Sequence, residues 1–492
     1  MLPRNKHRIY EIIPGATVWA TFLIGIALSF IQPLWVIYFI IVYDLFWLFR
    51  VINFLIHLFI SWQKYRVAIK RDWMEDLKKL PNWEKLCHLV FLPTYKEDIG
   101  VIETTFENLV KTHYPLKKMF IVLAGEERDK ENFLQIADNI KRKYGHFFKR
   151  FVITLHPAEK ADELAGKGSN IHYAGHKAKE LIDELRIPYE DIIVSTFDVD
   201  TITHRHYFAC LAYNYLTVPN PTRTAYQPIA LYGNNIWNVS APVRVAAFGT
   251  TFWLMMELAR PERLVTFSSH SMSFKALVDV GFWHKDIVSE DSRIFFQGLL
   301  HYHGDYNVVP IHLPVSMDTV TGKNYWENLK ALYKQQRRWA WGVEHFPYLV
   351  SNFLGDKLTP VKKRLLYLWR AWEGMFTWAT APILIFVLGR LPLYVMGEQA
   401  KQEVISQAAP YTLEWIMALS MIGIFASAVV SLLLLPRRPR KKRRLNWLVM
   451  LFQWALLPIT FVLFGSFPAI DAQTRLMTGR YLGFNVTEKK RE

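Results

Sequence analysis

The chain has 492 residues, of which 51% are hydrophobic and 15% aromatic, whereas only 21% are charged. This composition excludes a disordered chain and fits poorly with an ordinary soluble enzyme, in which about 25% of residues are charged. Lys and Arg exceed Asp and Glu by 59 to 43, which gives a net charge of +16, and two cysteines are too few for a disulfide framework. We therefore expect a membrane protein with a sizeable water-soluble part that faces the cytosol.

Two apolar runs, residues 16–31 and 34–60, lie near the N-terminus with only Gln32 and Pro33 between them. A membrane span needs about 20 mostly apolar residues, so the runs predict two transmembrane helices in a hairpin. A cleaved signal peptide is the alternative, but a second apolar run follows where a small-residue cleavage site would be needed. Lys and Arg residues flank both sides of the hairpin, which places both of its ends in the cytoplasm.

Short apolar runs alternate with polar stretches of helical periodicity between about residue 85 and residue 320. This alternation is typical of βαβ units, so we expect an α/β domain with a mostly parallel sheet. Ligands of such sheets bind at the carboxyl ends of the strands, where the functional side chains should lie. Strands are expected at 87–93, 118–124, 150–155 and 191–198, and helices at 97–113, 131–144 and 169–185.

The fourth expected strand ends in Asp198-Val199-Asp200. Two carboxylates one residue apart can share a hard divalent cation that also binds phosphate oxygens. Such an ion neutralises charge on a leaving diphosphate. The same short pattern occurs by chance, so an ordinary strand-end turn is the alternative.

Two further segments could serve an anionic substrate. Lys167 lies between two glycines before an expected helix, where backbone amides and one cation can approach a phosphate. An ordinary loop capped by Ser169 or Asn170 is the alternative. Asp291, which follows Glu290 at the start of an amphipathic stretch, could remove a proton from an acceptor hydroxyl or simply interact with the helix dipole.

Residues 325–346 combine Trp, Tyr, Leu and Phe with Lys and Arg, as in a helix that lies in the membrane interface. Arg338 could hold a diphosphate, and Trp339 could stack on a sugar. A helix that serves only as a surface anchor is the alternative.

Three more apolar stretches follow near the C-terminus, at about 366–391, 411–435 and 445–467. The basic run at 437–444 lies directly between the last two. A cytoplasmic loop on anionic lipid therefore explains this run better than a nucleic-acid site does.

Residues 204–286 are rich in aromatic residues, His and Asn. They could line an acceptor site, because aromatic rings stack on sugars and Asn binds hydroxyl groups. Packing in the core is the alternative. His204, His206 and His270 lack Cys or helical i,i+4 partners, so we expect no zinc site there.

Five segments in this order, between an N-terminal hairpin and C-terminal spans, resemble glycosyltransferase family 2, and within it the membrane-embedded cellulose and hyaluronan synthases. The segments are PTYKE (93–97), GKGSN (166–170), FDVD (197–200), SEDSR (289–293) and QQRRW (335–339). The resemblance implies a GT-A-like α/β domain in the cytosol, inserted between transmembrane helices.

The resemblance also implies roles for donor-binding residues. Thr94, Tyr95 and Glu97 match the segment that lines the nucleotide base and ribose. Lys167 matches a lysine near the diphosphate. Asp198 matches a nucleotide-sugar carboxylate and, together with Asp200, the ligands of Mg²⁺ or Mn²⁺. Glu127 and Asp129, with Glu126, stand where the family has paired aspartates near the base.

The remaining matches concern catalysis and the acceptor. Asp291 matches the proposed catalytic base, and Gln335, Arg338 and Trp339 match a Q-x-x-R-W signature that contacts the diphosphate and the acceptor sugar. FNVTEK (484–489) resembles a gating loop that closes over the nucleotide, which would bring Lys489 to the donor. Three late spans would place this motif outside the cell. Either the 445–467 segment is re-entrant at Pro458, or another segment does not cross, or the match is accidental. The basic residues of the tail favour a segment that does not cross.

Together these features predict a multi-pass, membrane-integrated, inverting glycosyltransferase with a cytoplasmic catalytic domain. Its donor is a nucleotide-diphosphate sugar, with a UDP-sugar favoured, and its acceptor is a polysaccharide or a lipid-linked molecule. The alternative is a membrane scaffold or a transporter with a degenerate nucleotide-binding domain. We expect a hairpin at 1–62, a basic linker at 63–84, the GT-A-like domain at 85–320, interfacial helices at 321–360, C-terminal spans at 361–470 and a tail at 471–492.

Overall fold

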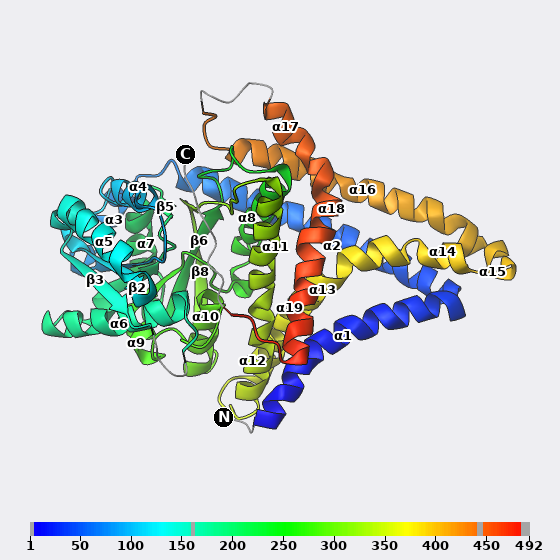
Figure 1. Ribbon diagram of the computed structural model, residues 1–492, viewed down its shortest axis with the longest axis horizontal. Coiled ribbons are helices and arrows are strands. Elements are labelled where there is room, and N and C mark those ends of the chain that lie inside the picture. Colours follow the sequence, from blue (N-terminus) through cyan, green and yellow to red (C-terminus); the bar gives the residue numbers. More distant parts are fainter. Residues whose placement is uncertain (1–3, 159–162, 440–445, 484–492) are drawn as a thin grey trace.

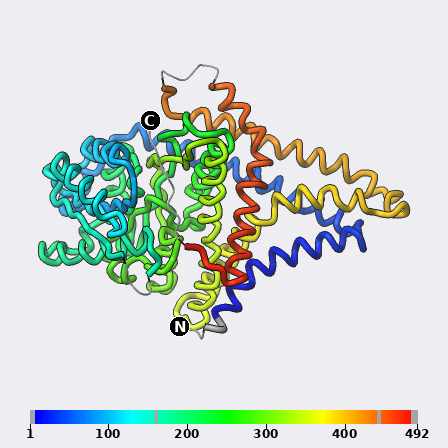
Figure 2. Tube along the Cα trace, viewed as in Figure 1, coloured from blue at the N-terminus to red at the C-terminus, as the bar shows by residue number. Residues whose placement is uncertain are grey.

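The computed structural model of the chain describes residues 4–158, 163–439 and 446–483. An α/β domain lies on one side of the molecule, and long helices extend away from it on the other (Figure 1). The Cα trace shows that helices from both ends of the sequence make up this helical part (Figure 2). The N-terminal helices therefore pack with helices that follow the α/β domain in the sequence.

An eight-stranded sheet forms the centre of the α/β domain, with the order β3-β2-β1-β4-β7-β6-β8-β5. The four predicted strands are parallel neighbours, which confirms the α/β prediction. The other half is mixed, because β7 is antiparallel to β4 and β6, and β5 is antiparallel to β8. The strands are β1 (Cys87–Pro93), β2 (Met119–Glu126), β3 (Arg150–His156), β4 (Ile192–Thr196), β5 (Ile202–Thr203), β6 (Thr224–Leu231), β7 (Ser271–Ser273) and β8 (Asn307–Ser316).

The register of the central strands positions the site. Every residue of β1, β2 and β4 is buried, as expected for strands of a parallel sheet that is covered on both faces. Pro93 pairs with Ala124, and Phe91 pairs with Thr196. The carboxyl ends of β1, β2 and β4 therefore meet at one edge of the sheet.

Helices cover both faces of the sheet. One face packs on α3 (Trp73–Leu77), α4 (Ile99–Leu109), α5 (Lys130–Tyr144) and α7 (Tyr207–Thr217). The opposite face packs on α6 (Lys167–Glu184), α8 (Ala241–Leu258), α9 (Phe274–Asp279) and α10 (Glu290–His301).

The second of these apolar layers continues into the long helices. Phe91 of β1 belongs to the same buried cluster as Leu58 of α2 (Pro33–Ala68), Leu434 of α16 (Val404–Leu434) and Trp454. The α/β domain and the helical part therefore share one apolar core.

Five helices among the described residues are long and apolar enough to cross a membrane. They correspond to the five apolar regions of the sequence, and the last one continues beyond the predicted end at residue 467. The five are His7–Ile31, Pro33–Ala68, Val361–Val395, Val404–Leu434 and Asn446–Thr478.

Two shorter helices connect the α/β domain to the C-terminal part. Helix α11 (Tyr325–Ala340) lies within the segment predicted to be an interfacial helix, and α12 (His345–Phe353) follows it after one short turn. Near the start of α11, Trp326 is 76% exposed, which suits a helix whose apolar face meets lipid. Arg337 of α11 is bound to Asp471 of α19 (Phe467–Thr478) at 2.8 Å.

Candidate active site

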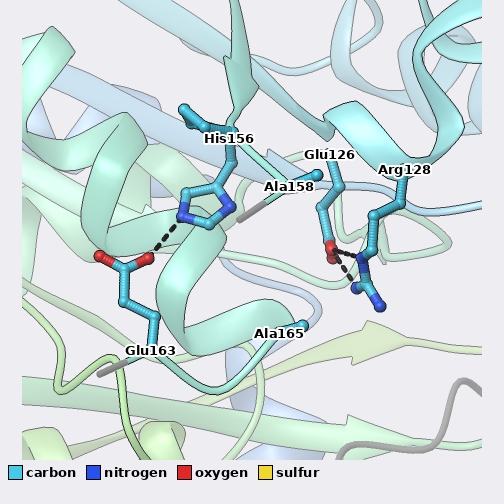
Figure 3. Close-up of a pocket in the computed structure, with 7 residues that line it drawn as sticks. Glu126, Arg128, His156, Ala158, Glu163 and Ala165 are labelled. Carbon is cyan, nitrogen blue, oxygen red and sulfur yellow. Dashed lines mark hydrogen bonds and ion pairs between the residues drawn. The ribbon is translucent and has the colours of Figure 1, made fainter. Parts of the chain in front are cut away.

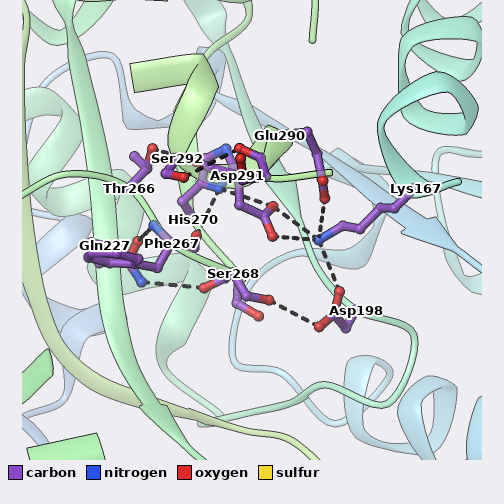
Figure 4. Close-up of polar contacts among 12 residues, drawn as sticks. Lys167, Asp198, Gln227, Thr266, Phe267, Ser268, His270, Glu290, Asp291 and Ser292 are labelled. Carbon is purple, nitrogen blue, oxygen red and sulfur yellow. Dashed lines mark hydrogen bonds and ion pairs between the residues drawn. The ribbon is translucent and has the colours of Figure 1, made fainter. Parts of the chain in front are cut away.

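Lys167 lies at the first turn of α6 and not, as the sequence suggested, in a loop before it. Gly166 is the N-cap, and the Ser169 hydroxyl does not cap the helix, because it donates to the carbonyls of Leu164 and Gly166 at 2.9 and 3.0 Å. The GKGSN segment therefore forms the helix start itself. This turn directs Lys167 toward the carboxyl edge of the sheet (Figure 4).

Three carboxylates surround the Lys167 ammonium group. Its Nζ lies 2.9 Å from Asp198 Oδ1, 2.9 Å from Asp291 Oδ2 and 3.4 Å from Glu290 Oε1 (Figure 4). Burial disfavours the charge on Lys167, but the three carboxylates outweigh this effect and hold its pKa well above the ordinary value. Lys167 therefore carries its charge at any physiological pH.

Asp291 and Glu290 occupy the first turn of α10. The Thr266 hydroxyl donates to the Asp291 carbonyl at 2.6 Å, and His270 Nδ1 lies 3.8 Å from Asp291 Oδ1. Burial, and then the neighbouring Asp291 carboxylate, raise the pKa of Glu290, whereas Lys167 opposes that rise. The two adjacent acids differ in burial, because the side chain of Glu290 is 4% exposed and that of Asp291 is 21% exposed.

A second layer of side chains holds the start of α10. The hydroxyl of Ser289 donates to Glu344 Oε1, and the Trp341 indole donates to Glu344 Oε2 at 2.9 Å. On the next turn, Ser292 Oγ lies 2.7 Å from His345 Nε2. The turn between α11 and α12 therefore positions the segment that contains Asp291.

The two aspartates after β4 have different surroundings. The Asp198 side chain is 29% exposed and accepts a hydrogen bond from the Ser268 hydroxyl at 3.1 Å. Asp200 is fully buried, and its Oδ2 accepts a hydrogen bond from the backbone N–H of Asp318 at 2.8 Å. Asp198 is therefore the more exposed of the two, and one carboxylate oxygen of Asp200 binds the backbone just beyond the end of β8.

These carboxylates suit a divalent ion only with help from a substrate. No group of three or more His, Cys, Asp or Glu among the described residues is arranged to hold a metal. Mg²⁺ commonly takes one or two protein carboxylates and completes its coordination with phosphate oxygens and water. The partly exposed Asp198, next to Asp200, fits that mode of binding.

A pocket lies at the carboxyl ends of β2 and β3 (Figure 3). The Glu126 carboxylate is bound by Arg128, with Nε at 3.0 Å, and His156 Nε2 lies 2.8 Å from Glu163 Oε2. The Arg128 guanidinium also lies 4.6 Å from the centre of the Tyr95 ring. The pocket is lined by Glu126, Arg128, His156, Pro157, Ala158, Glu163 and Ala165.

The loop after β1 is closed by its own side chains. Glu97 Oε2 accepts hydrogen bonds from the Thr94 hydroxyl at 2.9 Å and from the Tyr95 backbone N–H at 2.5 Å. Lys96 has a φ of 60°, a left-handed conformation that costs energy for a residue with a side chain. Asp129 supports this turn, because its Oδ2 accepts from the Lys96 N–H at 2.9 Å.

Glu127 differs from Glu126 in its contacts. Its Oε2 accepts a hydrogen bond from the Ala158 backbone N–H at 2.9 Å, so it stabilises the rim of the pocket. Glu126, which is buried, lines the pocket itself.

The opposite side of the site is formed by α11 and Tyr232. The rings of Tyr232 and Trp339 lie 5.7 Å apart, and Gln335 lines the same small pocket. Burial, and then the charges of Asp198, Asp200 and Asp291, raise the pKa of Tyr232, whereas Arg338 lowers it. The Q-x-x-R-W residues therefore lie beside the carboxylates that follow β4 and open α10.

The segment 204–286 divides between core and site. Tyr207, Phe208 and Tyr226 are completely buried in the apolar core. Thr266 and Ser268 instead bind Asp291 and Asp198, as described above. Neither residue was predicted individually, because Ser and Thr carry no sequence signature of such contacts.

The structure thus brings Lys167, Asp198, Asp291 and Arg338 together at one edge of the sheet. The pocket beside Tyr95 lies at the same edge. The FNVTEK segment with Lys489 lies outside the described residues.

The chain matches one family of known proteins. A family model described as glycosyl transferase family group 2 matches residues 193–464, which is more than half of the chain. No curated protein matches the sequence.

Solved structures of glycosyltransferases are similar at low sequence identity. A mannosyltransferase from Pyrobaculum calidifontis, in complex with GDP-Man and Mn²⁺, has 15% identity and a TM-score of 0.44, and the match covers 77% of this chain and 99% of that one. TarS 1–349 from S. aureus, in complex with UDP-GlcNAc, has 13% identity and a TM-score of 0.36, with 70% of this chain and 90% of that one covered.

Proposed function

Because the chain belongs to glycosyl transferase family group 2, it is a glycosyltransferase, and we propose that it moves a sugar, with inversion, from a nucleotide-diphosphate sugar to a polysaccharide or lipid-linked acceptor. The observation that carries this proposal is the single cation Lys167 between Asp198 and Asp291. This arrangement places a group that can bind a diphosphate next to a carboxylate that can accept a proton.

In the proposed reaction, Asp291 takes the proton from an acceptor hydroxyl. The hydroxyl oxygen then forms a bond to the anomeric carbon while the bond between that carbon and the nucleotide diphosphate breaks. Lys167 and Arg338 stabilise the negative charge on the departing diphosphate. The buried position of Lys167 supports this role, since charge interactions are stronger where water is excluded.

Asp198, together with Asp200, would hold Mg²⁺ or Mn²⁺. When bound, such an ion supplies positive charge to the leaving diphosphate. The Ser268 hydroxyl orients Asp198 for this role, because it binds one carboxylate oxygen at 3.1 Å.

We assign the pocket beside Tyr95 to the nucleotide base and ribose. The ring of Tyr95 and the buried carboxylate of Glu126 offer a stacking surface and an acceptor for base N–H groups. Thr94, Glu97, Glu127 and Asp129 keep this rim in place through the hydrogen bonds described above. A uracil base, with one N–H between two carbonyl oxygens, suits the neighbouring carboxylate of Glu126 and guanidinium of Arg128.

We assign the acceptor to the side formed by Tyr232, Gln335 and Trp339, since aromatic rings that line a small pocket suit sugars. The five long apolar helices would fix this side of the domain on the cytoplasmic face of a membrane. In this proposal, residues 85–320 form the catalytic domain, residues 321–360 lie at the interface, and the segments at 1–62 and 361–470 anchor it.

The test is nucleotide release by the full-length protein in lipid, with a panel of UDP- and GDP-sugars and Mg²⁺ or Mn²⁺. We expect metal-dependent release from one donor. Asp291→Asn should lower that rate at least about a hundredfold while nucleotide binding persists. Asp286→Asn, an exposed change five residues earlier, is the matched control and should stay active. Near wild-type release by Asp291→Asn would contradict its role as the base.

A further inference from the structure

Four arginines gather outside the site described above, where two long apolar helices meet the end of α8. Arg50 lies on α2, Arg260 and Arg263 follow α8, and Arg370 lies on α13 (Val361–Leu388). We call these four residues the arginine cluster. None of the sequence motifs discussed above includes any of them.

Polar contacts tie the arginine cluster to neighbouring elements. Arg370 Nη1 donates to the carbonyl of Glu262 at 2.6 Å, and Arg260 Nη1 donates to Asn53 Oδ1 of α2 at 3.4 Å. Arg50 forms an ion pair with Glu373 of α13. These contacts hold the turn after α8 against α2 and α13.

The cluster carries more positive than negative charge. Arg50 is matched by Glu373. Within the described part of the chain, Arg260 pairs with Glu262 at 3.8 Å and Arg263 with Glu257 at 4.0 Å, whereas Arg370 binds only the backbone carbonyl of Glu262. Glu257 is buried, and burial raises its pKa, whereas the nearby arginines lower it. Burial, and then repulsion by Arg263, lower the pKa of Arg260. An additional anion would relieve this repulsion.

Arg263 also has one N–H group that donates no hydrogen bond to the described residues around it. Its buried Nε makes no hydrogen bond within the described part of the chain, and the closest carboxylate oxygen, on Glu257, is 4.0 Å away. A guanidinium group is suited to phosphate because it offers several N–H donors in one plane.

Apolar side chains on α2 and α13 flank the cluster. Phe49 and Ile52 lie on either side of Arg50 in sequence and are 67% and 45% exposed. Trp369, next to Arg370, is 59% exposed. Such exposed side chains on helices long enough to span a bilayer suit lipid chains, whereas a site for free phosphate would not need them.

The cluster is close to the proposed active site along the chain. Arg263 and Thr266 are three residues apart, so their Cα atoms are separated by at most about 11 Å. Thr266 binds the carbonyl of Asp291 at 2.6 Å. Phe267, the next residue, packs against the exposed Trp253 of α8 with ring centres 4.9 Å apart. An apolar surface therefore lies beside the segment that connects the cluster to Asp291.

We propose that the arginine cluster binds the phosphate headgroup of a membrane lipid and thereby holds a lipid-linked acceptor beside Asp291. The identification of this lipid as the acceptor rests on the proposed function, but the binding of its headgroup does not.

The experiment compares two lipids with the same acyl chains, phosphatidic acid and diacylglycerol, bound to the full-length protein in detergent micelles and counted by native mass spectrometry. We expect retention of phosphatidic acid at least about tenfold stronger than that of diacylglycerol. Inorganic phosphate at the same concentration should not displace it. Equal retention of the two lipids, or displacement by inorganic phosphate, would overturn the proposal.

Variants locate the binding. Arg263→Gln should weaken retention of phosphatidic acid about tenfold, and Arg263→Lys should weaken it less, because a charge is kept. Arg66→Gln, an exposed change on α2, the helix that carries Arg50, is the matched control for net charge and should have little effect. An equal loss of phosphatidic acid retention in Arg66→Gln would show that the lipid responds to net surface charge and would contradict a specific site at the arginine cluster. If Arg263→Gln does not fold, Arg370→Gln replaces it with the same expectation.

Nucleotide release separates this inference from the proposed function. Arginine-dependent retention of phosphatidic acid, without release of nucleotide from any donor sugar, would support the lipid site and contradict the proposed function. Release of nucleotide from one donor sugar, with no preference for phosphatidic acid, would support the proposed function and contradict the lipid site.

Discussion

Lys167 Nζ lies 2.9 Å from Asp291 Oδ2, so one ion pair joins the first turn of α6 to the first turn of α10. The same ammonium group lies 2.9 Å from Asp198 at the end of β4. In the proposed function these residues bind the diphosphate, remove the proton and hold the metal. A single cation therefore fixes the spacing between groups that have to act on one substrate.

We expect Lys167→Gln to weaken donor binding at least about tenfold and to destabilise the protein. The change leaves Asp198, Glu290 and Asp291 without their shared cation, and an unpaired buried charge costs about 3 kcal/mol or more. Protonation relieves this repulsion, so the loss in melting temperature should be larger at pH 8 than at pH 5.5. Lys177→Gln, on the exposed side of α6, is the control. An equal loss at both pH values would contradict the electrostatic explanation.

Asp198→Asn should raise the concentration of Mn²⁺ or Mg²⁺ needed for half-maximal nucleotide release by at least about tenfold, since a neutral amide is a much weaker ligand for a hard cation than a carboxylate. A metal titration at saturating donor measures this. Asp138→Asn, an exposed change on α5, should leave the titration curve unchanged. The metal assignment is wrong if the two variants respond alike, or if chelation of divalent ions leaves release intact.

Glu290 should make the stability of the protein depend on pH. Burial and the Asp291 carboxylate raise its pKa in the folded state, so the folded protein binds a proton that the unfolded chain has released. This contribution is fully present below the ordinary pKa of Glu, about 4.3, and is lost as the pH rises toward the raised value. Melting temperatures between pH 5 and pH 8 should therefore fall less steeply in Glu290→Gln than in the wild type. Glu131→Gln, which is exposed, should retain the wild-type slope.

Glu344 is expected to be a positioning residue. It accepts hydrogen bonds from Ser289 and Trp341 and thereby holds the start of α10, without contacting Asp291 itself. Glu344→Gln should lower kcat about tenfold and leave the KM for the donor sugar nearly unchanged, because a small displacement of a catalytic group affects the transition state most. A rise in the KM for the donor sugar that is as large as the fall in kcat would indicate instead that the change disturbs donor binding.

The parallel half of the fold could be predicted from the sequence because its strands are buried on both faces. Runs such as residues 87–93 are apolar apart from His88, and polar helices separate them. The same pattern indicates Asp198 at the end of a predicted strand. Lys167 and Asp291 are indicated instead by the GKGSN and SEDSR segments at the starts of helices.

The mixed half could not be predicted in the same way. Strand β7 has only three residues, and β6 and β8 pair with a register shift at Pro228 and Ile229. The contacts of Thr266 and Ser268 depend on that irregular half of the sheet. The spacing of these two hydroxyl residues in the sequence does not predict which carboxylates they contact. The sequence also could not distinguish Asp198 from Asp200, because the difference between them comes from the distant backbone N–H of Asp318.

The shared apolar core of the sheet and the long helices has a consequence for acceptor selection. Phe91 of β1, Leu58 of α2 and Leu434 of α16 belong to one cluster, so the catalytic domain cannot tilt or lift away from the helices without exposing that cluster to water. With the long helices in a bilayer, as the proposed function has them, Asp291 would consequently be held at one fixed height above the bilayer plane. Only an acceptor whose hydroxyl group stands at that height could be used, and the enzyme would select acceptors by length as well as by chemistry.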